Sequence, residues 1–168
     1  MPSIYRHRRA GFGIRLLAFL VDCAIFGAPT MPLDAWAVKN GYISIFALTT
    51  ILGFLYKPMM EYWFGSTLGK MVCKLQVMRL DEGRIALGQA FLRYLPFAFG
   101  ELIPLVIITL RDLYPEMMVL LEKNIWFMIA DKIFVFLVPL IDCGWVLMGD
   151  SNLALHDILA KTKCVYRD

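Results

Sequence analysis

The chain has 168 residues, of which 60% are hydrophobic and 18% are charged, with a mean hydropathy of +0.64 and a formal net charge of +3. Soluble domains are about 45 to 50% apolar, so this composition excludes an ordinary soluble fold and indicates an integral membrane protein. The modest basic charge is divided among short segments, which excludes a nucleic-acid surface.

Four apolar segments are long enough to cross a bilayer core of about 30 Å. They predict an all-α bundle of four transmembrane helices, a single membrane domain over residues 1–168, with spans at about 12–33, 42–60, 94–110 and 125–149. The third segment is short and carries Glu101 and Pro104. The fourth carries Asp131 and Lys132 near its start, so the span itself could begin near Ile133.

The basic residues indicate how these spans are oriented. Lys and Arg concentrate before the first span, in the loop 61–93 and in the tail 150–168. Positively charged loops stay in the cytoplasm, so this loop, this tail and both termini are expected there, in a multi-pass inner-membrane protein.

Within the predicted spans, the candidate charged site consists of Arg15, Asp22, Glu101 and Asp142. A charge exposed to lipid costs several kcal/mol, so these groups must face protein, water or each other. Arg15 and Asp22 are seven residues apart and share one helix face. Counted from the cytoplasmic ends, all four fall in the inner half of the bundle, where they could meet.

Two interpretations of these charges stay open. One arginine cannot neutralise three carboxylates, so at least one acid is expected to hold a proton or a cation, as in a proton- or sodium-coupled transporter. Alternatively, Arg15 pairs with an acid to fix helix packing. In that case Asp157 in the tail could reach Arg15 or Lys70 as a latch, and Glu61 could pair with Lys57 or Lys70.

The loop and the tail contain the predicted soluble structure. Residues 74–80 partly alternate polar and apolar side chains, Asp81-Glu82-Gly83 signals a turn, and 84–87 could return as a second strand, which predicts a small cytoplasmic β-hairpin. The tail predicts a short helix from Asn152 to Lys161. Residues 162–166 are extended in character and could add a third strand to the hairpin.

The loop also begins with a glycine-rich segment, Gly65-Ser66-Thr67-Leu68-Gly69-Lys70. A phosphate-binding loop needs four residues between its glycines and a Ser or Thr after the lysine, and this segment has three residues and Met71. We expect it instead to turn the chain sharply off the second span, with Lys70 near lipid phosphates. The four cysteines form no zinc-binding pattern. No nucleophile with a base is apparent, so neither an enzyme, a catalytic residue, a metal nor a cofactor is predicted.

The order of these motifs resembles the RDD family of small membrane proteins. The resemblance rests on the segment from Gly13 to Asp22, the glycine-rich segment with Leu75-Gln76-Val77, Gly83 and Arg93 after it, and the segment from Leu155 to Thr162 with its His156-Asp157 pair. The family is named for one Arg and two Asp, which implies Arg15 and Asp22, with Asp157 or alternatively Asp142 as the second Asp. For its function the resemblance implies little beyond the usual suggestion of ligand or ion transport.

The sequence favours two functions. The first is a small ion- or proton-coupled transporter that uses the intramembrane Arg, Asp and Glu. The second is a non-transporting subunit or scaffold that binds a protein partner or anionic lipid through the cytoplasmic hairpin and tail. The expected partners are the bilayer, a second copy or another membrane protein, and a proton or sodium ion.

Overall fold

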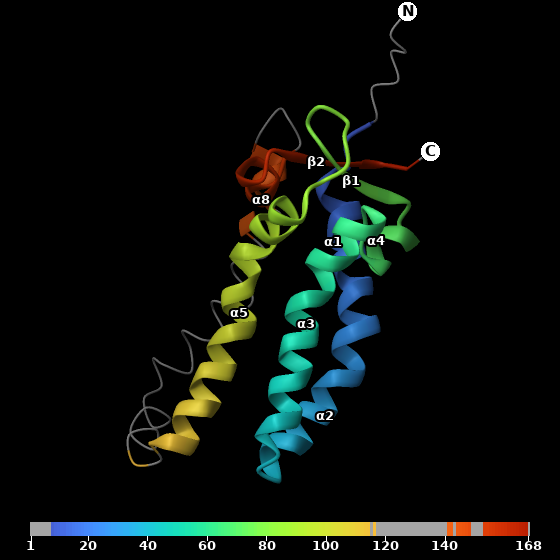
Figure 1. The fold of residues 1–168 in the computed structure, drawn as a ribbon. Helices are drawn as coiled ribbons and strands as arrows, with labels where there is room; N and C mark the ends of the chain where they lie inside the picture. The colour runs from blue at the N-terminus through green and yellow to red at the C-terminus, as the bar shows by residue number, and fades with distance from the viewer. Residues whose placement is uncertain (1–7, 115, 117–140, 143, 149–152, 168) are drawn as a thin grey trace, which may run out of the picture.

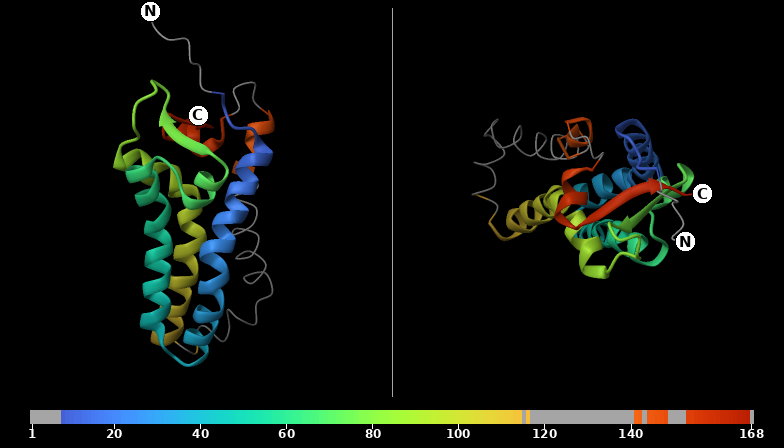
Figure 2. Two further views of the ribbon diagram at one scale, coloured as in Figure 1. Left: turned by 90° about the vertical axis from the view of Figure 1, so that its right-hand side faces the viewer. Right: turned by 90° about the horizontal axis from the view of Figure 1, so that it is seen from above.

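Long helices and a small cap of short elements make up the computed structural model of the protein (Figure 1). It describes residues 8–114, 116, 141–142, 144–148 and 153–167. Helices α3 and α5 pack against each other, and α2 packs against α3 (Figure 2). The first and last described residues lie at the same end of the molecule, beside the cap.

The first long helical stretch is continuous from Phe12 to Lys39, with a change of geometry in its middle. It consists of α1 (Phe12–Asp22), a π-helical turn η1 (Cys23–Gly27) and α2 (Ala28–Lys39). Pro29 and Pro32 follow the wide turn. Because proline has no N–H to donate to the fourth carbonyl before it, the regular hydrogen-bond pattern is interrupted beside this turn.

Helix α3 (Ile43–Phe64) and the stretch 12–39 are each long and apolar enough to cross a membrane. Helix α5 (Leu87–Leu113) contains the predicted third span. Most of the predicted fourth span lies outside the described residues, although 141–142 and 144–148 are helical. The described part is therefore mostly helical, with two membrane-length apolar helices and one small sheet.

The cap consists of α4 (Leu68–Val72), β1 (Leu75–Arg79), α8 (Leu155–Leu159), β2 (Thr162–Tyr166) and the N-terminal arm, residues 8–10. Strands β1 and β2 pair antiparallel, with Leu75 opposite Tyr166 and Arg79 opposite Thr162. The arm lies along the other edge of β2, where Ala10 N–H donates to the Cys164 carbonyl. A small core of Ala10, Ala18, Leu75 and Cys164 joins the sheet to α1.

The predicted hairpin within the loop is wrong. The turn at 81–83 forms, but residues 84–86 are not a strand, and β1 pairs with the tail strand β2. Ile85 is instead buried against Val77 and Ala90, so this side chain fills a second small core. A two-stranded ribbon is marginal alone, and pairing with β2 gives β1 a partner that is itself held by the arm and α8.

Candidate functional site

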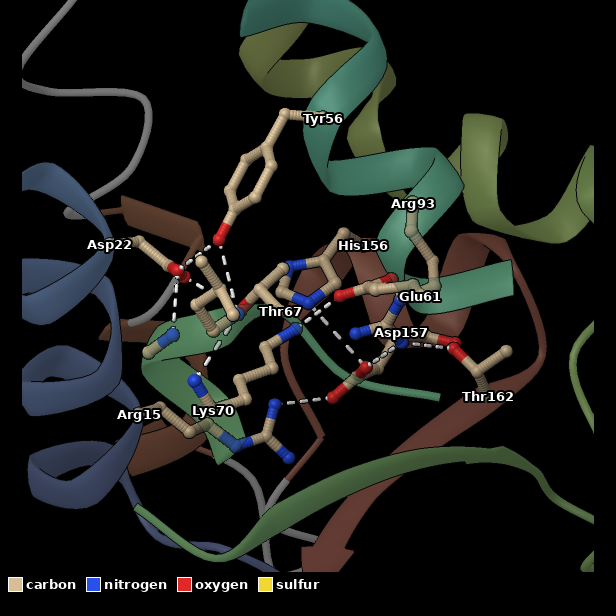
Figure 3. A network of polar contacts seen from close by, with 12 residues as sticks. Arg15, Asp22, Tyr56, Glu61, Thr67, Lys70, Arg93, His156, Asp157 and Thr162 are labelled. Atoms are coloured by element: carbon tan, nitrogen blue, oxygen red, sulfur yellow. Dashed lines mark hydrogen bonds and ion pairs between the residues drawn. The ribbon is translucent and has the colours of Figure 1, made fainter. Parts of the chain in front are cut away.

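A cluster of buried charged side chains joins the cap to the long helices (Figure 3). Its centre is Asp157 of α8, whose side chain has no exposed surface. Asp157 Oδ2 accepts a hydrogen bond of 2.5 Å from Arg15 Nη1 on α1, and Oδ1 accepts from Arg93 Nη1 on α5. One carboxylate therefore ties three helices that lie far apart in the sequence.

Arg93 extends the cluster to α3. Its Nε donates to Glu61 Oε2 at 2.9 Å, and its Nη1 also donates to the Thr162 hydroxyl at the start of β2. The other oxygen of Glu61 accepts from Lys70 on α4. Buried ion pairs need such additional hydrogen bonds, because the mutual attraction of two charges alone rarely offsets the cost of removing them from water.

The surroundings of Asp157 decide its protonation state. Burial by itself raises the pKa of this carboxyl, but the positive charges of Arg93, His156 and Arg15, with the hydrogen bond from Arg15, hold the pKa far below its ordinary value. Asp157 is therefore a permanent anion at neutral pH.

His156 connects this cluster to the helical residues 141–142. Its Nδ1 lies 2.5 Å from Asp142 Oδ2, and its backbone N–H donates to Asp142 Oδ1 at 2.9 Å. The other ring nitrogen lies 3.5 Å from Asp157 Oδ1. Adjacent residues on α8 thus contact two different acids.

Asp22 lies at the last turn of α1 and binds the glycine-rich segment. Its carboxylate accepts hydrogen bonds from the Thr67 hydroxyl at 2.6 Å, from Gly69 N–H at 2.8 Å and from the Tyr56 hydroxyl at 2.9 Å. Among the buried acids that the structure describes, Asp22 differs from Glu61 and Asp157, which pair with arginine or lysine, because the donors to it are all uncharged.

The glycines in this segment have geometric roles. Gly65 ends α3 with a left-handed φ of +70°, which glycine adopts without strain. At Gly69 a Cβ atom would lie 2.1 Å from the Ala18 carbonyl oxygen of α1. Thr67 begins α4 as its N-cap. The segment is thus a docking loop for α1.

A cavity of about 80 Å³ opens beside the cluster. Its charged lining consists of four cationic side chains and two carboxylates, which are Arg15, Lys57, Lys70, Arg93, Asp22 and Glu61. His156 and Thr67 add polar atoms, and Phe19, Pro58 and Phe97 supply apolar surface. Lys57 Nζ lies 5.1 Å from the ring centre of Phe19 and 5.5 Å from that of Phe97.

A second cavity of about 170 Å³ lies between the stretch 12–39 and α3. It is lined by the π-helical turn, by Thr30 and Thr49, and by Tyr56. Asp22 and Lys57 line both cavities. π-Helical turns occur frequently at functional sites, and this one borders the cavity directly after Asp22.

The structure separates the predicted charged site into parts. Arg15 and Asp22 both line the first cavity, but Arg15 contacts Asp157 whereas Asp22 contacts α4 and α3. Asp142 contacts His156. Glu101 lies in α5, and its side chain is outside the described residues. The proposed contacts of Asp157 with Arg15 and of Glu61 with Lys70 are present.

The sequence did not predict Tyr56 as a member of the site, and it identified Arg93 only as part of the family resemblance and of the basic loop. Arg93 directly precedes the third apolar segment, at the end of the basic loop 61–93. One signal could have linked Arg93 to Glu61. A basic residue at the end of one apolar segment can pair with an acid at the end of another. Tyr56 has no comparable signal, because a tyrosine in an apolar helix is common near the interface.

The apolar helices and the buried polar cluster at one end point to the class of small helical membrane proteins with a folded cap. Within that class, the chain belongs to the RDD family, whose model matches residues 9–161. The uncharacterised protein YckC of Bacillus subtilis is 30% identical over 117 residues, which cover 63% of this chain and 76% of YckC. No solved structure matches the chain.

Proposed function

We propose that the protein is a four-span inner-membrane transporter, with both termini in the cytoplasm, which couples the movement of a small solute to a proton or a sodium ion. The observation that carries this proposal is that two cavities, one beside the cap and one between the long helices, share Asp22 and Lys57. Ionisable residues within a membrane domain mark the pathways of ions and substrates, and here two such residues border both cavities.

Asp22 is the residue that would couple the ion to the solute. A proton or sodium ion that arrives at this carboxylate weakens its attraction for the Gly69 amide and the Tyr56 hydroxyl, because a neutralised carboxylate is a poorer acceptor. These two bonds hold α4 and α3 against α1. Ion binding would therefore loosen the boundary between the two cavities without breaking an ion pair.

Flux in reconstituted vesicles tests this proposal. Wild-type vesicles should show a pH- or sodium-dependent solute flux, and Asp22→Asn should abolish it. Because Asp22→Asn also alters the α4 contact, Thr30→Val is the second variant. The Thr30 side chain lines the second cavity, and its hydrogen bonds to described residues are both within its own helical stretch, to the Phe26 and Gly27 carbonyls. We expect Thr30→Val to reduce flux with unchanged folding.

Asp81→Asn is the matched control, since Asp81 is an exposed acid in the turn after β1 and lines neither cavity. Wild-type vesicles with no flux above empty liposomes, over a range of cations and solutes, would exclude the transporter. The orientation is tested separately with single cysteines: Cys73 should react with an impermeant maleimide from the cytoplasmic side, and Asn40→Cys from the opposite side.

The second candidate is a non-transporting subunit, which forms an oligomer or binds another membrane protein or anionic lipid. One observation favours it: Arg15, Arg93 and Lys70 each already pair with a carboxylate, so these contacts can serve only to hold the cap to the long helices. Purification from the native membrane with a partner of fixed stoichiometry, together with absent flux, would favour this function.

A further inference from the structure

One nitrogen of Arg93 has no hydrogen-bond partner in the described part of the chain. Arg93 is 2% exposed, and its Nε and Nη1 are hydrogen-bonded, but its Nη2 is buried and contacts no acceptor among the described residues. A buried guanidinium N–H without an acceptor is costly, and nearly all such groups in folded proteins bind an acceptor. Figure 3 shows the Arg93 guanidinium pointing into the middle of the cluster, among Glu61, His156 and Asp157.

Lys57 is a second cation beside the same space. Its ammonium group lies near the rings of Phe19, Tyr94 and Phe97, and no carboxylate of the described residues lies within ion-pair distance of it. Aromatic faces hold a cation in place but do not neutralise it. The positive charge of Lys57 is therefore not balanced by a described carboxylate, and an anionic ligand could pair with it.

The side chains around the first cavity carry a net positive charge. Cationic side chains outnumber carboxylates in its lining, and they still do so when Asp157, which lies behind Arg15 and Arg93, is included. Asp142, which contacts His156, does not line this cavity and is not part of the balance. The space is larger than one water molecule needs, and much of its wall is apolar.

We propose that the first cavity binds an organic anion, with a carboxylate or phosphate head between Arg93 Nη2 and Lys57 Nζ and a short apolar part against Phe19, Phe97 and Pro58. This inference rests on the proposed function, since it names the ligand class of the same cavity. A planar guanidinium is well suited to an oxyanion, and the nearby ammonium supplies the second charge. The anion could be a soluble metabolite or the head of an acidic lipid, and the experiment separates the two.

The test measures equilibrium binding to the full-length protein in nanodiscs of phosphatidylcholine. Hexanoate is the soluble probe, and hexanamide, which has the same apolar part without the charge, is its matched control. We expect saturable binding of hexanoate with at least tenfold weaker binding of hexanamide. Lys57→Gln should weaken hexanoate binding at least tenfold. Lys39→Gln, at an exposed lysine of α2, should leave it unchanged.

A second arm replaces part of the lipid with phosphatidylglycerol. Competition between this lipid and hexanoate, lost in Lys57→Gln, would identify a lipid head as the occupant, whereas hexanoate binding unaffected by the lipid would identify a soluble anion. No saturable binding of hexanoate or of the lipid, or equal binding by wild type and Lys57→Gln, would overturn the anion site.

Flux is measured separately, in reconstituted vesicles. Cation-coupled flux without anion binding would overturn only this site, and anion binding without flux would overturn only the transporter.

Discussion

Arg15 on the first helix donates to Asp157, which lies 142 residues further along the chain. This contact, with that of Arg93 to the same carboxylate, joins the beginning, middle and end of the described chain at one buried point. The cap therefore cannot leave the long helices without separating buried charges, so it should behave as part of the membrane domain.

Asp157→Asn should strongly destabilise the protein. The change leaves two buried guanidinium groups short of one negative charge, and breaking a buried ion pair by removing one partner costs about 3–5 kcal/mol. The free energy of unfolding, measured by denaturant titration in detergent, should fall by that amount. Asp81→Asn is the control, because the Arg79–Asp81 pair is about half exposed and should contribute at most about 1 kcal/mol.

The contribution of Asp157 should disappear in acid. Its pKa is lowered in the folded protein, so its stabilisation is complete above the unfolded-state pKa of about 3.9 and declines as the pH falls below that value. The difference in unfolding free energy between wild type and Asp157→Asn should be constant from pH 7 to pH 5 and smaller at pH 3. A difference that grows toward acid would contradict the assignment of Asp157 as an anion.

Gly69→Ala should detach α4 from α1. The added Cβ would overlap the Ala18 carbonyl oxygen, and the backbone must move to relieve the overlap, at a cost of about 1–3 kcal/mol or more. Thermal unfolding in detergent measures the loss. Gly88→Ala in the first turn of α5 is the matched control: nothing lies within 4 Å of its Cβ, so stability should be unchanged or raised by up to about 1 kcal/mol.

Tyr56→Phe should weaken the contact between α3 and the docking loop. The change removes the hydroxyl that donates to Asp22 and accepts from Leu68 N–H, and each bond contributes about 0.5–1.5 kcal/mol. The unfolding free energy should fall by about 1–3 kcal/mol. If Asp22 also couples an ion to a solute, the pH dependence of flux should change in this variant. A flux profile identical to that of wild type would separate Tyr56 from coupling.

Cys164 reports whether the cap is closed. It is 1% exposed on β2, and burial raises the pKa of its thiol, although Arg15 and Lys70 oppose this shift. Only the thiolate reacts with maleimide, so a variant with Cys164 as its single cysteine should react slowly when folded and rapidly when unfolded. Asp157→Asn should increase the rate in the folded state. Equal rates in both proteins would show that Asp157 does not keep the cap closed.

The sequence alone determined the membrane class, the family resemblance, and the positions of the apolar helices that the structure describes. It also identified Arg15 and Asp22, because a charge in an apolar run is energetically conspicuous, and Asp157, through the family resemblance and as a possible latch to Arg15 or Lys70. Residues 12–39 and 43–64 are helical largely where their hydrophobic runs predict, since the length of an apolar run is a local property of the chain.

Only the tertiary structure decided which groups are partners. A buried charge requires a counter-charge, but several carboxylates satisfy that requirement equally well in the sequence, and the choice of Asp157 for Arg15 and Arg93 depends on where α8 is held. The pairing of β1 with β2, rather than with the adjacent residues 84–87, was decided in the same way. Both outcomes depend on contacts between distant segments, which local patterns of hydrophobicity and charge do not contain.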